Sequence, residues 1–232
     1  MFLTKDNHIK WRALGIGAAL TAVLCLMGVM WGDRQIFLYL RDFDCMLFRA
    51  FGHIFQAKAW LVVTAVLMVM FYIKKTINTE SYFIENIKNF KFGLILSNFL
   101  EKTKNSYAFF MFCSILSACV VTGIIKVVLG RARPILYEGL GQTGFFPFSG
   151  DWVFHSMPSG HTTASFAALV MMGLLAPRMK WATWTLAVMI GVSRVCVGAH
   201  WPSDVILGAF IGMAAADLVK SGLIRRLGRF GD

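Results

Sequence analysis

The stretch SRVCVGAHWPSD, residues 193–204, places Arg194, His200 and Asp204 between two strongly apolar runs. Ionisable residues are costly in such a setting and usually have a function. His200 and Asp204 are four residues apart, and the Pro-Ser pair between them is suited to starting a helix. A carboxylate at that spacing can take the Nδ1–H of the imidazole and leave Nε2 as a nucleophile. The stretch therefore predicts nucleophile chemistry at the start of a helix.

The rest of the chain has the composition of a membrane protein. Of its 232 residues, 57% are hydrophobic and 15% are charged, whereas soluble domains are usually about 45–50% apolar. The five cysteines show no metal-ligand spacing, so we expect buried thiols and no metal site. The net charge of +11 could indicate nucleic acid, but the basic residues flank the apolar runs, as membrane topology requires. We therefore expect a lipid bilayer as partner and no nucleic acid.

Apolar runs predict six membrane-spanning helices in one domain, residues 1–232. The first run is 19 residues long and lacks a cleavage site, so we expect a retained span. Segments around 34–51 and 82–100 are amphipathic at helical spacing and are expected to lie in the membrane interface. The predicted fold class is therefore all-α, a six-helix membrane bundle with interfacial helices. The predicted spans are 13–31, 59–73, 107–125, 162–176, 181–199 and 205–219.

Two patterns add detail to this bundle. GAFIG, residues 208–212, has small residues four apart, which favours close helix packing within the bundle over a dimer face. Clusters of lysine and arginine all fall on one side of a six-span arrangement, which the positive-inside rule assigns to the cytoplasm together with both termini. These clusters are Lys5/Lys10/Arg12, Lys74/Lys75 with Lys88/Lys91/Lys102/Lys104, Arg178/Lys180, and Lys220/Arg225/Arg226/Arg229.

The opposite side carries a second motif, KVVLGRARP, residues 126–134. Lys126 and Arg133 form a cation pair able to reach one anion, and Pro134 ends any preceding helix. For Arg131 a role in topology or lipid-headgroup binding is favoured over catalysis. The Gly- and Phe-rich loop that follows, 135–157, is a candidate for the substrate entrance.

A third motif, PSGH, residues 158–161, precedes an apolar helix. Ser159 and the backbone N–H groups of Gly160 and His161 can therefore bind an anion that the helix N-terminus favours. Cations, two histidines and a helix N-terminus together suit phosphoryl transfer, in which positioning and charge stabilisation are most of the catalysis. No metal ion or other cofactor is needed to assemble this set, and we expect none.

The three motifs, intact and in order, resemble the signature of the type 2 phosphatidic acid phosphatase superfamily. The resemblance implies that His200 attacks phosphorus to give a phosphohistidine, that Asp204 orients it, and that His161 protonates the leaving group and then assists water. The phosphate ligands that it implies are Lys126, Arg133, Ser159, Gly160 and Arg194.

The six predicted spans favour the membrane branch of this superfamily over its soluble acid phosphatases and vanadate-dependent haloperoxidases. Residues around the motifs look most similar to bacterial lipid A 1-phosphatases and less so to phosphatidylglycerophosphate or undecaprenyl pyrophosphate phosphatases. Met157 is a small departure, since relatives often carry Phe there. We therefore expect a lipid phosphatase of a bacterial inner membrane, with its site facing the periplasm.

Two alternatives remain open. A lipid-to-lipid phosphotransferase would use the same residues and pass the phosphoryl group to a second lipid. A non-catalytic phospholipid-binding or transport protein would need the cations but not an oriented nucleophile, so both histidines and Asp204 argue against it. The oligomeric state is not indicated.

Overall fold

The computed structural model describes residues 1–77 and 92–227, and this part of the chain is all-helical, without a strand. Its first elements are α1 (Trp11–Met27), the π-helical turn η1 (Gly28–Gly32), α2 (Asp33–Arg41), α3 (Met46–Ile54) and α4 (Ala57–Ile77). The middle elements are α6 (Phe92–Thr103), α7 (Tyr107–Leu129), α8 (Pro134–Leu140) and the short η2 (Trp152–Phe154). The last elements are α9 (Gly160–Leu175), η3 (Pro177–Met179), α10 (Lys180–Cys196) and α11 (Pro202–Leu227).

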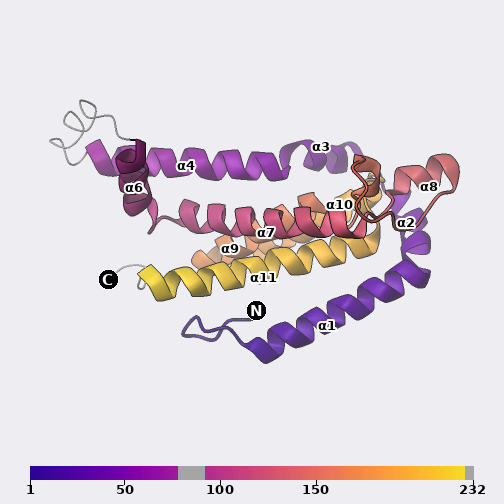
Figure 1. Cartoon of the computed structure of the whole chain (residues 1–232), viewed down its shortest axis with the longest axis horizontal. Helices are drawn as coiled ribbons and strands as arrows, with labels where there is room; N and C mark the ends of the chain where they lie inside the picture. Colours follow the sequence, from indigo (N-terminus) through magenta and orange to yellow (C-terminus); the bar gives the residue numbers. More distant parts are fainter. Residues whose placement is uncertain (78–91, 228–232) are drawn as a thin grey trace.

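Helix α9 lies at the centre of the bundle. It contacts α7, α10 and α11, and most of its side chains are buried. Its first half, from Thr162 to Ala168, consists mostly of small residues, which let the neighbouring helices approach closely. Figure 1 shows α4, α7, α9 and α11 running along the long axis of the molecule, with α1 beside α11.

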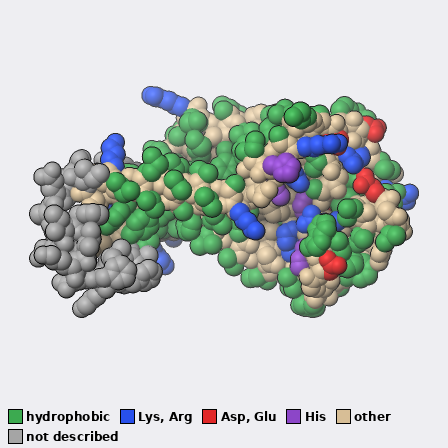
Figure 2. Space-filling model, turned by 90° about the horizontal axis from the view of Figure 1, so that it is seen from above, with side chains coloured by type: hydrophobic (Ala, Val, Ile, Leu, Met, Phe, Trp, Pro, Cys, Tyr) green, Lys and Arg blue, Asp and Glu red, His purple; other side chains and the backbone are tan. Residues whose placement is uncertain are grey.

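Four helical segments are long and apolar enough to cross a membrane. They are Trp11–Arg41, Ala57–Thr76, Tyr107–Leu129 and Pro202–Leu227. Large apolar side chains are exposed along these segments, and Figure 2 shows them covering much of one face. The chain is therefore a membrane protein, as predicted. Because α9 has 16 residues and α10 has 17, both short for a bilayer, the count of six spans stays a prediction.

The predicted amphipathic helix at 34–51 is two helices. Helix α2 continues from α1 through η1, and α3 begins only after Cys45, whose backbone is extended. Asp44 lies in the break and accepts hydrogen bonds from Arg41 at 3.1 Å and from Arg49 at 2.7 Å. These contacts hold the turn that separates the helices. Of the second predicted segment, 82–91 lie outside the described residues and the remainder belongs to α6.

The described basic clusters share one end of the bundle. Lys102 at the end of α6 binds Thr76 at the end of α4, and Lys220 donates to the carbonyl of Leu174 at the end of α9. This end carries α6 and the C-terminus in Figure 1, whereas α2 and α8 lie at the other end. The predicted clustering on one side is thus present in the fold. Lys88, Lys91 and Arg229 lie outside the described residues.

Candidate active site

His200 and Asp204 meet where α10 passes into α11. His200 lies in the connecting turn and Asp204 in the first turn of α11, which Pro202 opens. The distance from His200 Nδ1 to Asp204 Oδ2 is 3.5 Å, and the two residues are 2% and 0% exposed. His200 Nδ1 makes no hydrogen bond within the described part of the chain, and contacts at catalytic sites are often long before substrate binds. The structure therefore places the carboxylate beside the imidazole, and the hydrogen bond between them stays a prediction.

Asp204 is fixed by three further groups. Its Oδ2 accepts from Ser156 Oγ at 2.5 Å and from the backbone N–H of Trp201 at 2.9 Å. Its Oδ1 accepts from Arg131 Nη1 at 2.7 Å. A buried carboxylate is stable only with such partners, and they also hold it in one orientation. Asp204 is thus positioned by contacts that do not depend on His200.

Arg131 is buried, which does not fit the role in topology or lipid-headgroup binding that the sequence favoured. It is 6% exposed, and besides Asp204 it binds Asp33 Oδ2 through Nη2 at 2.6 Å. Burial opposes its charge, but the two carboxylates outweigh burial and raise the pKa of Arg131 above its ordinary value. Sequence reasoning missed Asp33, although an acid directly after an apolar run of this length is itself a signal of function.

Two predicted phosphate ligands lie beside the nucleophile. Lys126 Nζ donates to the carbonyl of His155 at 2.7 Å, and Arg133 donates to the same carbonyl at 3.3 Å and to that of Ala199 at 3.4 Å. A Cβ placed on Gly160 would lie 3.8 Å from Lys126 Cε, so the start of α9 adjoins this lysine. The cation pair and the helix N-terminus therefore meet.

Arg194 and His161 both lie against Gly52 of α3. The carbonyl of Arg194 accepts the N–H of His200 at 3.2 Å, and Arg194 Nε is buried without a hydrogen-bond partner in the described part of the chain. His161 Nε2 lies 3.1 Å from the carbonyl of Gly52. A Cβ on Gly52 would come within 2.2 Å of Arg194 Nη1, so only glycine leaves this guanidinium in place. No local sequence pattern predicts a role for Gly52, because this contact joins distant parts of the chain.

Ser159 caps α9 and is fully buried. Its Oγ accepts from Thr162 Oγ1 at 3.0 Å, and its N–H donates to the carbonyl of Asp204 at 2.9 Å. It therefore ties the start of α9 to the start of α11. The first N–H groups of a helix have no intrahelical acceptor, so those of Gly160 and His161 are suited to an anion.

The charges of the site favour a neutral nucleophile and an anionic ligand. None of the ion pairs within the described ranges involves Lys126, Arg133 or Arg194. Burial lowers the pKa of His200 to about 3, which Arg133 and Lys126 reinforce and Asp204 opposes. Figure 2 shows the histidine side chains in view at one end of the molecule, with basic and acidic side chains around them. Such a site can bind a phosphate group and attack it.

Known proteins match the part of the chain that forms this site. A family model described as the PAP2 superfamily matches residues 107–225. A lipid A 1-phosphatase of Rhizobium etli is 37% identical over 123 residues, which cover 51% of this chain and 53% of that protein. An undecaprenyl-diphosphatase of Sulfolobus acidocaldarius is 30% identical over 120 residues, or 47% of this chain and 57% of that protein. The chain thus spans about half the length of these curated relatives.

One solved structure also resembles the chain. The crystal structure of Aquifex aeolicus LpxE matches with a TM-score of 0.47 and 16% sequence identity, covering 81% of this chain and 93% of that one.

Proposed function

This chain belongs to the PAP2 superfamily, and from that premise we propose that it is an integral-membrane lipid phosphatase that forms a phosphohistidine on His200. The observation that carries the proposal is the buried His200–Asp204 pair, set beside cations that have no acidic partner within 4.0 Å in the described chain. Binding alone needs the cations, whereas an imidazole that is kept neutral and oriented suits nucleophilic attack.

In the first step, the Nε2 lone pair of His200 attacks phosphorus opposite the leaving oxygen. A P–N bond forms, the P–O bond to the lipid breaks, and the leaving oxygen takes the bonding electrons and a proton from His161. Asp204 accepts the Nδ1–H and offsets the positive charge that the imidazole gains. Lys126, Arg133 and the α9 N-terminus stabilise the charge on the equatorial oxygens.

In the second step, water attacks phosphorus while His161 accepts its proton. The new P–O bond forms, the P–N bond breaks, and its electron pair returns to Nε2 of His200. Free phosphate leaves, and His161 is again protonated for the next cycle. The oxygen in the product phosphate therefore comes from water.

The proposed substrate is a phosphorylated lipid whose tail stays in the bilayer. Apolar helices surround the site end, so the head group reaches the cations while the acyl or prenyl chains remain in lipid. The relatives named as lipid A 1-phosphatase and undecaprenyl-diphosphatase support lipid A or a polyprenyl pyrophosphate as candidates, and phosphatidylglycerophosphate fits the same chemistry. We further propose six spans in a bacterial inner membrane, with this site on the periplasmic side.

Phosphate release by protein purified in detergent tests the function. Wild type, His200→Ala and the control His53→Ala, an exposed histidine on α3, are assayed on lipid A, phosphatidylglycerophosphate, phosphatidic acid and undecaprenyl pyrophosphate. We expect wild type and His53→Ala to act on one of these lipids and His200→Ala to lose about 1,000-fold or more. Equal release by His200→Ala would exclude the phosphohistidine.

One further reading of the same assay separates hydrolysis from transfer, and another tests the metal-free mechanism. Loss of phosphate from the lipid without free phosphate would indicate transfer to a second lipid.

Vanadate, which adopts the five-coordinate geometry of phosphorus during transfer, is expected to inhibit, whereas a chelator is expected to have no effect. Activity lost to the chelator and restored by a metal ion would contradict this mechanism.

A further inference from the structure

We propose that Asp33 is a positioning residue of the reaction and acts on His200 through Arg131 and Asp204. The inference rests on the proposed function. Asp33 lies far from the motifs in sequence, and also outside the residues that the PAP2 family model matches. The N-terminal helices would then be part of the catalytic apparatus as well as a membrane anchor.

The π-helical turn between α1 and α2 leads to Asp33, which lies against the start of α11. Asp33 is the first residue of α2, directly after the π-helical turn, and it is 4% exposed. Its Oδ1 accepts the N–H of Ser203 at 2.9 Å, and its Oδ2 accepts Ser203 Oγ at 2.5 Å and Arg131 Nη2 at 2.6 Å. Both carboxylate oxygens are therefore used, and π-helical turns often mark functional positions.

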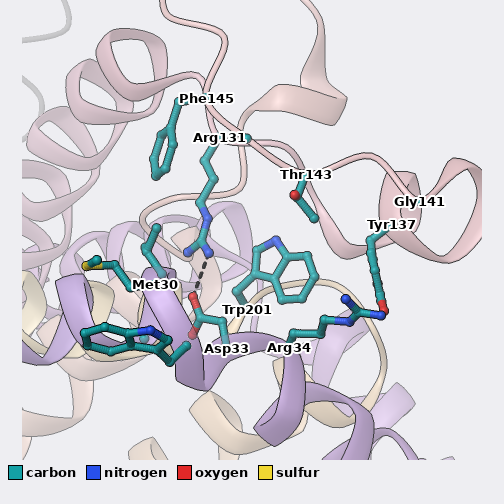
Figure 3. Close-up of a pocket in the computed structure, with 13 residues that line it drawn as sticks. Met30, Asp33, Arg34, Arg131, Tyr137, Gly141, Thr143, Phe145 and Trp201 are labelled. Carbon is teal, nitrogen blue, oxygen red and sulfur yellow. Dashed lines mark hydrogen bonds and ion pairs between the residues drawn. The ribbon is translucent and has the colours of Figure 1, made fainter.

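Arg131 bridges the two carboxylates. Its Nη1 binds Asp204 at 2.7 Å while its Nη2 binds Asp33. The buried chain of contacts runs Asp33–Arg131–Asp204–His200, with 3.5 Å at its last step. Figure 3 shows the Arg131 guanidinium pointing at Asp33 beside the ring of Trp201. A planar guanidinium with two paired N–H edges holds both partners in fixed orientation.

The net charge of Asp33, Arg131 and Asp204 explains the role that we assign to Asp33. Arg131 alone would cancel the charge of Asp204, leaving no net negative charge to offset the imidazolium character that His200 gains on attack. Asp33 makes the three buried groups net negative by one charge. In a poorly solvated site this charge favours the state in which the imidazole is positive. Asp33 should thus affect the chemical step more than substrate binding.

The first test is Asp33→Asn, which keeps the shape of the side chain and removes its charge. We expect kcat to fall about 10- to 100-fold, by analogy with the loss found when a group that orients a metal-ligating side chain is removed. KM should change by less than about threefold, because no phosphate ligand is altered. The matched control is Cys25→Ala, which removes a 3.5 Å contact from α1 to the carbonyl of Ser203 and leaves every charge in place.

A cavity beside Asp33 allows a second test by chemical rescue. Its volume is about 450 Å³, and Asp33, Arg131 and Trp201 are among its lining residues (Figure 3). A small anion can therefore enter and replace the carboxylate in Asp33→Ala. We expect formate to restore part of kcat in this variant and formamide, the neutral molecule of the same shape, to restore none. Assays of wild type and Cys25→Ala in the same concentration of formate show whether formate itself inhibits the enzyme.

The outcomes separate the two proposals. If wild type is active and His200→Ala is not, the proposed function stands. In that case two results would overturn the role of Asp33. One is a folded Asp33→Asn with the kcat of wild type, and the other is equal rescue of Asp33→Ala by formate and formamide. If wild type and His200→Ala release phosphate equally, the proposed function fails and the role of Asp33 fails with it. Melting temperatures in detergent verify folding, and if Asp33→Ala does not fold, the kcat of Asp33→Asn decides.

Discussion

At the scale of single residues, burial sets the protonation state of the nucleophile. Burial lowers the pKa of His200 to about 3, whereas an unperturbed imidazole has a pKa of about 6.5. At pH 5 the unfolded chain therefore binds a proton at this residue and the folded chain does not. The neutral His200 ring therefore contributes its full stability at a pH above the pKa of the residue in the unfolded chain. This stability is lost as the pH falls from that value toward the pKa in the folded protein.

We accordingly expect the His200 ring to remain neutral at pH 5. Nitrogen-15 NMR of histidine-labelled protein in detergent measures this, because ring nitrogens shift strongly on protonation. Comparison with His200→Asn assigns the resonance. A protonated His200 at pH 5 in the absence of ligand would contradict the burial argument.

A contact in the site can be predicted from the sequence when its residues are close together along the chain. Local spacing was enough to predict that His200 and Asp204 lie close together, because only four residues separate them where a turn enters a helix. Arg131 lies within a motif, but its burial depends on Asp33 nearly a hundred residues away. Such a contact has no local pattern, and surface exposure was therefore the wrong expectation for this arginine.

At the scale of elements, the α9–α11 contact depends on small residues. The pattern at 208–212 favoured packing within the bundle, and the structure agrees: a Cβ on Gly212 would lie 2.6 Å from Phe166 Cβ and from the carbonyl of Thr163. The predicted segment at 34–51 is helical, but the structure divides it into α2 and α3. Its apolar spacing continues through the turn at Asp44, and only side-chain contacts to Arg41 and Arg49 end one helix there.

We predict that Gly212→Ala destabilises the bundle and that Gly222→Ala on the same helix does not. Gly222 has no atom within 4 Å of an added Cβ. Overpacking at Gly212 should cost about 1–3 kcal/mol, while alanine at Gly222 should gain about 0.5–1 kcal/mol as a better helix former. Unfolding in detergent followed by circular dichroism measures both. Equal stability of the two variants would show that α9 and α11 can separate at little cost.

At the scale of the whole molecule, the bundle has two chemically different ends. Basic clusters gather at the end with α6 and the C-terminus, and the candidate site lies at the end with α2 and α8 (Figure 1). In the orientation that we propose from the positive-inside rule, the first end faces the cytoplasm. With this orientation the site would act on lipids from the other side of the membrane, where a phosphorylated head group meets the cations directly.

Thiol labelling tests this orientation with a cysteine that the chain already has. Cys45, between α2 and α3, is exposed at the site end, whereas Cys25 and Cys196 are buried. Cys113 and Cys119 are half-buried but lie in the apolar helix α7, which a membrane would shield from the reagent. A membrane-impermeant maleimide should therefore label wild type in intact spheroplasts and should not label Cys45→Ser. In the Cys45→Ser background, Glu101→Cys at the exposed end of α6 should react only after the membrane is opened. The reverse pattern would place the site in the cytoplasm and would require a substrate supplied from that leaflet.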